Sequence, residues 1–137
     1  MSALDGVRIL YVEDDRQSRE IMRVLVEELL GLPGLVIFED SAQFLERVHT
    51  LTPKPDLILL DVHVLPYDAF AMLSMLRSDG FRDTPVAALT ASVMHEEIHR
   101  LKTAGFDGVI AKPVDLDTFP TTLERVLARE YVWNLVH

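Results

Sequence analysis

The sequence predicts an α/β fold, a doubly wound (βα)5 arrangement in which five parallel strands form one sheet with helices on both faces. Five short apolar runs recur along the 137-residue chain, and each is followed by a longer stretch with apolar residues at helical spacing. Within the runs the apolar residues are consecutive rather than alternating, which is typical of strands covered on both faces. Regular alternation of strand and helix favours a parallel sheet with right-handed crossovers.

The apolar runs predict the five strands. They cover residues 7–12, 35–38, 57–60, 86–89 and 108–111. The third run, Leu57-Ile58-Leu59-Leu60, is apolar throughout, and Pro85 opens the fourth. Each strand is therefore expected to lie inside the sheet with both of its faces buried.

The stretches between the runs predict five helices, each with one apolar face. Gly31-Leu32-Pro33-Gly34 ends the first helix, Gly80 ends the third and Gly105 ends the fourth. The second helix is expected over residues 41–49, and Pro120 lies early in the fifth, where its missing N–H matters least. The residues expected to mark the inward faces are, in chain order, Ile21, Val24, Leu25, Leu29, Phe44, Leu45, Val48, Phe70, Leu73, Leu76, Val93, Ile98, Leu101, Ala104, Leu116, Phe119, Leu123, Val126 and Leu127.

Length predicts a single domain over residues 1–137, with a core at about 7–130 and an apolar C-terminal tail at 131–137. In the tail, Tyr131 and Leu135 keep the i, i+4 spacing of Leu127, so they are expected to continue the inward stripe of the last helix. An exposed partner or dimer patch is the alternative interpretation of this segment.

Composition excludes several classes of protein. The chain has no cysteine, which excludes a disulfide scaffold and a thiolate metal site. A net charge of -9, without a basic stripe, argues against nucleic acid as a partner. The first residues lack the pattern of a signal peptide, and the apolar runs are too short to span a bilayer. A cytoplasmic protein with no membrane association is expected.

Polar residues follow four of the five predicted strands. Glu13-Asp14-Asp15 follows the first, Asp61 the third, Thr90 the fourth and Lys112-Pro113 the fifth. The carboxyl ends of parallel strands meet at one edge of the sheet, where ligands of such sheets bind. Clustered carboxylates repel one another, so a cation is expected among them, and oxygen ligands without nearby His or Cys suit Mg²⁺.

The same residues suggest chemistry at phosphorus. A carboxylate beside Mg²⁺ and a lysine can attack a phosphoryl group, because the cations neutralise charge on the transferred group. Singly, each residue has a more ordinary interpretation: Asp15 as a helix cap, Thr90 as a cap and Lys112 as a surface charge. Their joint position at one sheet edge favours a site.

Four segments together resemble a known family. They are Val12-Glu13-Asp14-Asp15, Leu59-Leu60-Asp61-Val62-His63, Leu89-Thr90-Ala91-Ser92 and Lys112-Pro113, and they resemble the receiver domain of bacterial two-component response regulators. The similarity covers about residues 7–130 and is greatest to single-domain receivers of the chemotaxis type. It implies a flavodoxin-like fold.

The resemblance also implies roles for individual residues. Asp61 is expected to be the phosphoacceptor and a metal ligand, with Asp14 as a direct Mg²⁺ ligand. Glu13 is expected to act on the ion directly or through water, and the backbone carbonyl of His63 to complete the protein's share of the coordination. Lys112, preceding a cis Lys112-Pro113 bond, is expected to contact a phosphoryl oxygen.

For signalling, the resemblance implies that Thr90 donates its hydroxyl to the phosphoryl group and draws the following loop inward, while Ala91 keeps the entrance to the site small. The donor is expected to be a histidine kinase or histidine phosphotransfer protein, and an unidentified downstream protein is expected to read the switch. A dimer through the face of the fourth and fifth helices, or through the tail, is a further possibility. The chain would then be a signalling switch rather than an enzyme.

The sequence departs from the family pattern at two places. Leu65 stands at the usual proline position with Pro66 after it, and Asp68-Ala69 stands where Asp-Gly is usual. Because proline restricts its own φ and the residue before it, this loop is expected to take an altered path. Val109 occupies the position where the family usually has Tyr or Phe, so the protein is expected to signal to its partner by a different mechanism.

Three other functions are compatible with parts of this pattern. A flavin electron carrier would need a phosphate loop after the first strand, where Glu13-Asp14-Asp15 would repel phosphate. A Mg²⁺-dependent phosphohydrolase would need an aspartate nucleophile at the position of Glu13. A degenerate receiver that only binds proteins would not need the complete set of Asp61, Thr90 and Lys112.

Overall fold

The computed structural model describes residues 3–130 and 133. Strands and helices alternate along the chain as the sequence predicts, apart from a π-helical segment, η1, that directly follows α1. The elements are β1 (Ile9–Val12), α1 (Arg16–Arg23), η1 (Val24–Leu29), β2 (Val36–Phe38), α2 (Phe44–His49), β3 (Leu57–Asp61), α3 (Ala69–Ser78), β4 (Val86–Thr90), α4 (His95–Ala104), β5 (Gly108–Ala111) and α5 (Phe119–Leu127).

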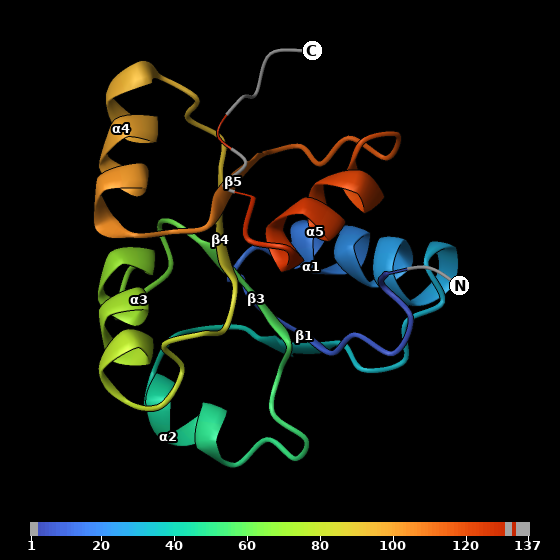
Figure 1. The fold of residues 1–137 in the computed structure, drawn as a ribbon, viewed down its shortest axis with the longest axis horizontal. Coiled ribbons are helices and arrows are strands. Elements are labelled where there is room, and N and C mark those ends of the chain that lie inside the picture. The colour runs from blue at the N-terminus through green and yellow to red at the C-terminus, as the bar shows by residue number, and fades with distance from the viewer. Residues whose placement is uncertain (1–2, 131–132, 134–137) are drawn as a thin grey trace.

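All five strands are parallel and form one sheet in the order β2-β1-β3-β4-β5. In Figure 1, α1 and α5 lie on one side of the sheet, and α2, α3 and α4 lie on the other. Successive strand residues point to opposite faces, so Leu10 and Val12 join the core cluster beside α2 to α4 while Ile9 and Tyr11 join the cluster beside α1 and α5. The predicted doubly wound, flavodoxin-like fold is confirmed.

The predicted inward face of the first helix is right at Leu25 but wrong at Ile21, Val24 and Leu29. Ile21, Val24 and Leu29 are 43%, 45% and 62% exposed, and the buried residues include Met22 and Leu25. Met22, Leu25 and Val26 are the buried residues and keep α-helical spacing, so the buried stripe lies about one residue along from the predicted one. Leu29 lies at the end of a π-helical segment, η1, whose wider turn carries it outward. The residues left outside line an open groove of about 480 Å³ that also includes Leu116.

Several helix ends also differ from the prediction. The second helix begins at Phe44 rather than Ser41, because Gln43 adopts a left-handed conformation with φ 49°. Val93 and Leu116 precede α4 and α5 and are about half exposed. Ala104 is exposed at the end of α4, so it does not mark the inward face of that helix.

The last helix ends at Leu127, and the chain turns at Arg129, whose φ is +56°. The prediction that Tyr131 and Leu135 continue the inward stripe concerns residues that lie outside the described part of the chain, so it stays a prediction. Trp133 is partly buried against the core cluster beside α2 to α4, on the opposite side of the sheet from α5.

A buried charge network ties the amino end of β5 to α3 and to the turn after α5. The Asp107 side chain is 1% exposed; Oδ2 accepts from Arg77 at 3.0 Å and from the Val86 amide at 2.9 Å. Its Oδ1 accepts from Arg129 at 3.0 Å. A buried carboxylate is tolerated when it is paired and hydrogen bonded, as it is here.

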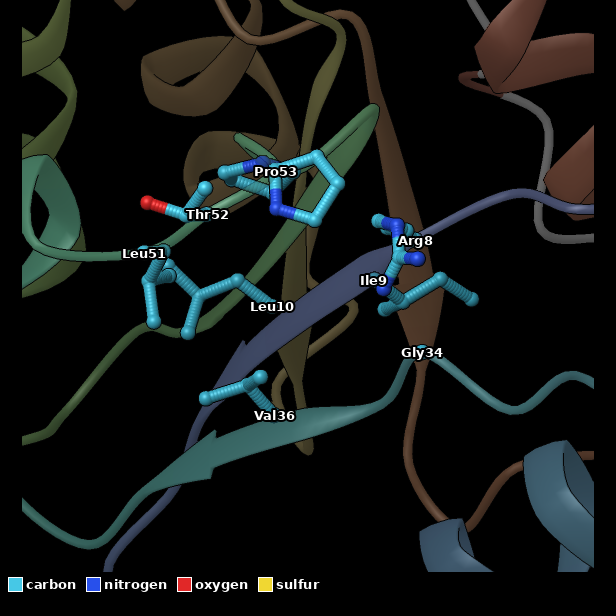
Figure 2. Close-up of a pocket in the computed structure, with 9 residues that line it drawn as sticks. Arg8, Ile9, Leu10, Gly34, Val36, Leu51, Thr52 and Pro53 are labelled. Carbon is cyan, nitrogen blue, oxygen red and sulfur yellow. The ribbon is translucent and has the colours of Figure 1, made fainter.

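The amino edge of the sheet is closed around a small pocket of about 70 Å³, shown in Figure 2. Its walls come from β1, β2 and the segment before β3, including Leu10, Val36 and Pro53. A Cβ atom on Gly34 would lie 2.8 Å from Cγ of Arg8, so glycine permits the close approach there. The lining residues include no carboxylate, so this pocket does not contain the predicted acidic site.

Candidate functional site

The carboxyl edge of the sheet brings together side chains from three strand ends. Glu13 and Asp14 follow β1, Asp61 is the last residue of β3, and Lys112 follows β5. β1 and β3 are hydrogen-bonded neighbours, and β4 separates β3 from β5. Lys112 therefore reaches across the end of β4 to meet the carboxylates.

Lys112 joins the two inner carboxylates. Its Nζ lies 2.7 Å from Oε1 of Glu13 and 2.9 Å from Oδ1 of Asp61. Glu13 is only 1% exposed and Asp61 7%, so neither carboxylate has free access to water. Hydrogen bonds between ionised groups in such a setting are stronger than those at the surface.

These contacts affect the pKa of Lys112. Burial lowers the pKa of the ammonium, but hydrogen bonds to Glu13 and Asp61 and the charges of both carboxylates outweigh burial and leave it above its ordinary value. Lys112 therefore stays protonated at neutral pH and keeps its positive charge beside Asp61.

The acidic residues form a cluster that suits a hard cation. One carboxylate oxygen from each of Glu13, Asp14 and Asp61 lies within 4.8 Å of the others, and Asp14 is exposed to solvent. Three carboxylates against one lysine leave a local excess of negative charge, and oxygen donors are the ligands that Mg²⁺ prefers. The donor set therefore fits the ion that the sequence predicts.

The remaining predicted site residues have local contacts. The His63 amide donates to Oδ2 of Asp61 at 3.3 Å, while the predicted role of the His63 carbonyl stays a prediction. The Thr90 hydroxyl is buried and accepts from the Ser92 amide at 3.0 Å. The Thr90 carbonyl accepts from the Lys112 amide at 2.9 Å, so the paired ends of β4 and β5 place these two residues beside each other. The Lys112-Pro113 bond is cis, as predicted.

Two further contacts fix the backbone that carries Glu13 and Asp14. Asp15 caps α1 by accepting from the Ser18 amide at 2.9 Å, which confirms the predicted cap. The hydrogen bond from the Ser18 hydroxyl, and then that from its amide, lower the pKa of Asp15. Arg19 donates to the carbonyls of Glu13 and Asp14 at 3.2 and 2.7 Å.

Sequence reasoning missed Tyr11. Its hydroxyl donates to Oε1 of Glu13 at 2.7 Å, and the ring is buried among the residues beside α1 and α5. Burial, and then the hydrogen bond and charge of Glu13, raise the pKa of the hydroxyl far above its ordinary value. The available signal was a tyrosine in an otherwise aliphatic run, two residues before an acid and hence on the same side of the chain.

Ser41 was also missed, and it fixes the unusual loop after β3. Its buried hydroxyl donates to the Tyr67 carbonyl at 2.7 Å and accepts from the Tyr67 amide at 2.6 Å. Its amide donates to the Leu65 carbonyl at 3.1 Å. Leu65 itself is 73% exposed, and the Leu65-Pro66 bond is cis. The Leu65–Tyr67 segment is thus held by main-chain contacts to Ser41, while the Leu65 side chain projects outward.

A parallel five-stranded sheet with acids and a lysine at its carboxyl edge is the arrangement expected of a receiver-type signalling domain. Comparison with known families identifies the family: the family model of the response regulator receiver domain matches residues 9–124. The chain belongs to that family and is a receiver domain of two-component signalling. This membership favours the receiver over the flavin carrier and the phosphohydrolase.

Several curated proteins are similar over most of this chain. The polar-differentiation response regulator DivK of Brucella anthropi is 28% identical, and the alignment covers 87% of this chain and 94% of DivK. Response regulator MprA of Mycobacterium ulcerans is 32% identical over 90% of this chain and 51% of MprA. The osmosensing histidine protein kinase SLN1 of Saccharomyces cerevisiae is 27% identical over 90% of this chain but only 10% of SLN1. The chain thus spans from about a tenth to nearly all of the length of these three relatives.

Solved structures support the fold. The chemotaxis response regulator CheY4 of Vibrio cholerae superposes with a TM-score of 0.78 at 23% identity, covering 88% of this chain and 98% of CheY4. The receiver domain of sensor histidine kinase PA1611 from Pseudomonas aeruginosa gives 0.77 at 23% identity over 90% and 98%, and that structure has a magnesium ion coordinated in the active site cleft. Among the described residues of the present chain, no helix is long and apolar enough to cross a membrane.

Proposed function

We propose that this receiver domain accepts one phosphoryl group on Asp61 in a Mg²⁺-dependent step and changes conformation to signal to a partner. The observation that carries the proposal is the Lys112 ammonium, 2.9 Å from Asp61 and 2.7 Å from Glu13, at the mouth of the three-carboxylate cluster. A buried aspartate at a sheet edge, with a cation beside it, is arranged for attack on phosphorus.

In the proposed step, a carboxylate oxygen of Asp61 forms a bond to phosphorus while the bond from phosphorus to the leaving group breaks. The leaving group, an imidazole nitrogen of a phosphohistidine or the carboxylate of acetyl phosphate, takes the electron pair. Lys112 neutralises negative charge on the transferred oxygens. Bound Mg²⁺, held by Asp14 and Asp61 with Glu13 and the His63 carbonyl nearby, would supply further neutralisation of that charge.

For the switch, the Thr90 hydroxyl is the group we expect to move. It is engaged with Ser92 in the turn after β4, so it must leave that turn to donate to a phosphoryl group on Asp61. The loop that carries Ala91 and Ser92 would follow. A ligand shifts such an equilibrium only through its greater affinity for one of the two states, and the new hydrogen bond supplies that difference.

The proposed donor is a histidine kinase or a histidine phosphotransfer protein, as receiver-family membership and the similarity to SLN1 suggest. We also propose that residues 1–137 form a single domain, that the protein is cytoplasmic, and that an unidentified downstream protein reads the switch. Dimerisation through the α4 and α5 face stays a prediction.

The test is incubation with acetyl phosphate or phosphoramidate, with Mg²⁺ and with a chelator, followed by intact mass and released phosphate. We expect a Mg²⁺-dependent gain of one phosphoryl group in wild type and in Asp68→Asn, an exposed helix cap where asparagine serves equally well. Asp61→Asn should gain nothing. Continuous phosphate release without a labelled protein would indicate a hydrolase, and neither signal would indicate a module that only binds proteins.

A further inference from the structure

Tyr11 is the one polar side chain in β1, and its hydroxyl is not needed to fill the core. The ring is 1% exposed and packs among the apolar residues beside α1 and α5, a role that phenylalanine would serve as well. A buried hydroxyl is unfavourable unless it is hydrogen bonded. Its position therefore depends on the acceptor it has found, Oε1 of Glu13 at 2.7 Å.

That same oxygen also receives the lysine. Lys112 Nζ lies 2.7 Å from Glu13 Oε1, so one carboxylate oxygen has two short contacts from protein donors on either side. The second oxygen, Oε2, accepts a longer bond of 3.3 Å from the Asp15 amide. The Glu13 carboxylate is thus turned inward and engaged by the protein, whereas Asp14 faces solvent.

Tyr11 and Lys112 also share surroundings. Both line a small cavity of about 90 Å³ beneath α1, whose other walls include Met22 and Val114. Tyr11 and Lys112 therefore both contact Oε1 of Glu13 and border the same space.

We propose that Tyr11 is a positioning residue, whose hydroxyl holds Glu13 turned toward Lys112. Glu13 then fixes the ammonium beside Asp61 and leaves direct carboxylate coordination of the cation to Asp14 and Asp61. This inference rests on the proposed function of the site, because it states which of the same acids bind the cation and which one holds Lys112.

The test is Tyr11→Phe, followed by two titrations with opposite expected results. Without the hydroxyl, Glu13 Oε1 is less tightly held and can turn to the cation, so Mg²⁺ should bind about two- to tenfold more tightly by calorimetry, the effect of one hydrogen bond. Lys112 is then held less firmly by Glu13 beside Asp61, so beryllofluoride at saturating Mg²⁺ should bind about two- to tenfold more weakly. A merely structural tyrosine would weaken both or change neither, and either result would overturn the proposal.

Two controls sharpen the experiment. Thr50→Val removes an exposed hydroxyl at the end of α2 and should change neither affinity. In a Glu13→Ala background, Tyr11→Phe should have no further effect on either titration, because the proposed action passes through Glu13. A full additional effect in that background would contradict this route.

A measurement on the wild-type protein covers the case in which Tyr11→Phe does not fold. The hydrogen-bonded hydroxyl proton of Tyr11 should keep its NMR resonance when Mg²⁺ saturates the site. Loss of that resonance would mean that Glu13 leaves Tyr11 for the ion, which overturns the inference. The Mg²⁺ titrations require no phosphodonor, so they remain informative even if phosphorylation of Asp61 is not observed.

Discussion

Replacing Lys112 with methionine should destabilise the folded protein in the absence of divalent cation. The substitution keeps most of the side chain's volume but removes two charge-assisted hydrogen bonds, of 2.7 Å to Glu13 and 2.9 Å to Asp61. Each such bond contributes about 1.5–3 kcal/mol to stability. The lysine side chain is 20% exposed, so water offsets part of this loss. We expect a decrease of about 3 kcal/mol in the free energy of unfolding, with two nearly buried carboxylates left without their cation.

Urea unfolding in a chelating buffer measures this change, and Lys102→Met, at an exposed lysine of α4, is the matched control. The control should stay within about 0.5 kcal/mol of wild type. Adding Mg²⁺ should restore more stability to Lys112→Met than to wild type, because the ion meets a more negative cluster and binds the folded state preferentially. A loss below about 1 kcal/mol would instead indicate that Lys112 is an ordinary surface charge.

The pH dependence of this difference follows from the pKa of Lys112. Because the folded-state pKa lies above the ordinary value of 10.5, the stabilisation is fully present below that value and is lost as the pH rises through the folded pKa. The gap between wild type and Lys112→Met should therefore be constant between about pH 6 and 9 and close only in strong alkali. A gap that closes near neutral pH would contradict the assignment.

Three further outcomes are expected. Asp14→Ala should weaken Mg²⁺ binding at least tenfold by calorimetry, since it removes one of few direct carboxylate ligands; unchanged affinity would place the ion elsewhere. Asp107→Ala should lower the free energy of unfolding by about 3 kcal/mol or more, because it leaves Arg77, Arg129 and the Val86 amide without their buried acceptor, whereas Glu46→Ala on the exposed face of α2 should be nearly neutral. Beryllofluoride should change hydrogen exchange most in residues 90–93 and 65–68 and less around Val109, a small, stiff residue buried in β5; a largest change centred on Val109 and α5 would contradict this distribution.

The parts of the fold that depend on local pattern could be predicted from the sequence. Continuous apolar runs locate the strands, and the parallel sheet then places Glu13, Asp14, Asp61 and Lys112 at one edge. The inward face of the first helix was predicted only in part, because its apolar residues allow two neighbouring stripes and the core takes the one with Met22, Leu25 and Val26. The π-helical segment η1 then turns Leu29 outward, which the spacing could not show.

Contacts between distant residues account for most of what the sequence did not reveal. From the sequence alone Asp107 resembles an ordinary turn residue, because its partners are Arg77 in α3 and Arg129 in the turn after α5. Tyr11 acquires its role only because Lys112, 99 residues after Glu13, draws that acid inward. Ser41 likewise depends on a loop 26 residues further along the chain. Such partners are determined by tertiary packing, which no local spacing encodes.

The most direct test of the central proposal locates the phosphoryl group itself. After reaction with acetyl phosphate and Mg²⁺, borohydride reduction converts an aspartyl phosphate into homoserine, which peptide mass spectrometry can place in the sequence. If Asp61 is the phosphoacceptor, we expect homoserine at position 61 and at no other acidic residue, with none formed when Mg²⁺ is chelated. Homoserine at Asp14 or Asp15, or labelling at position 61 that persists without the metal, would contradict it.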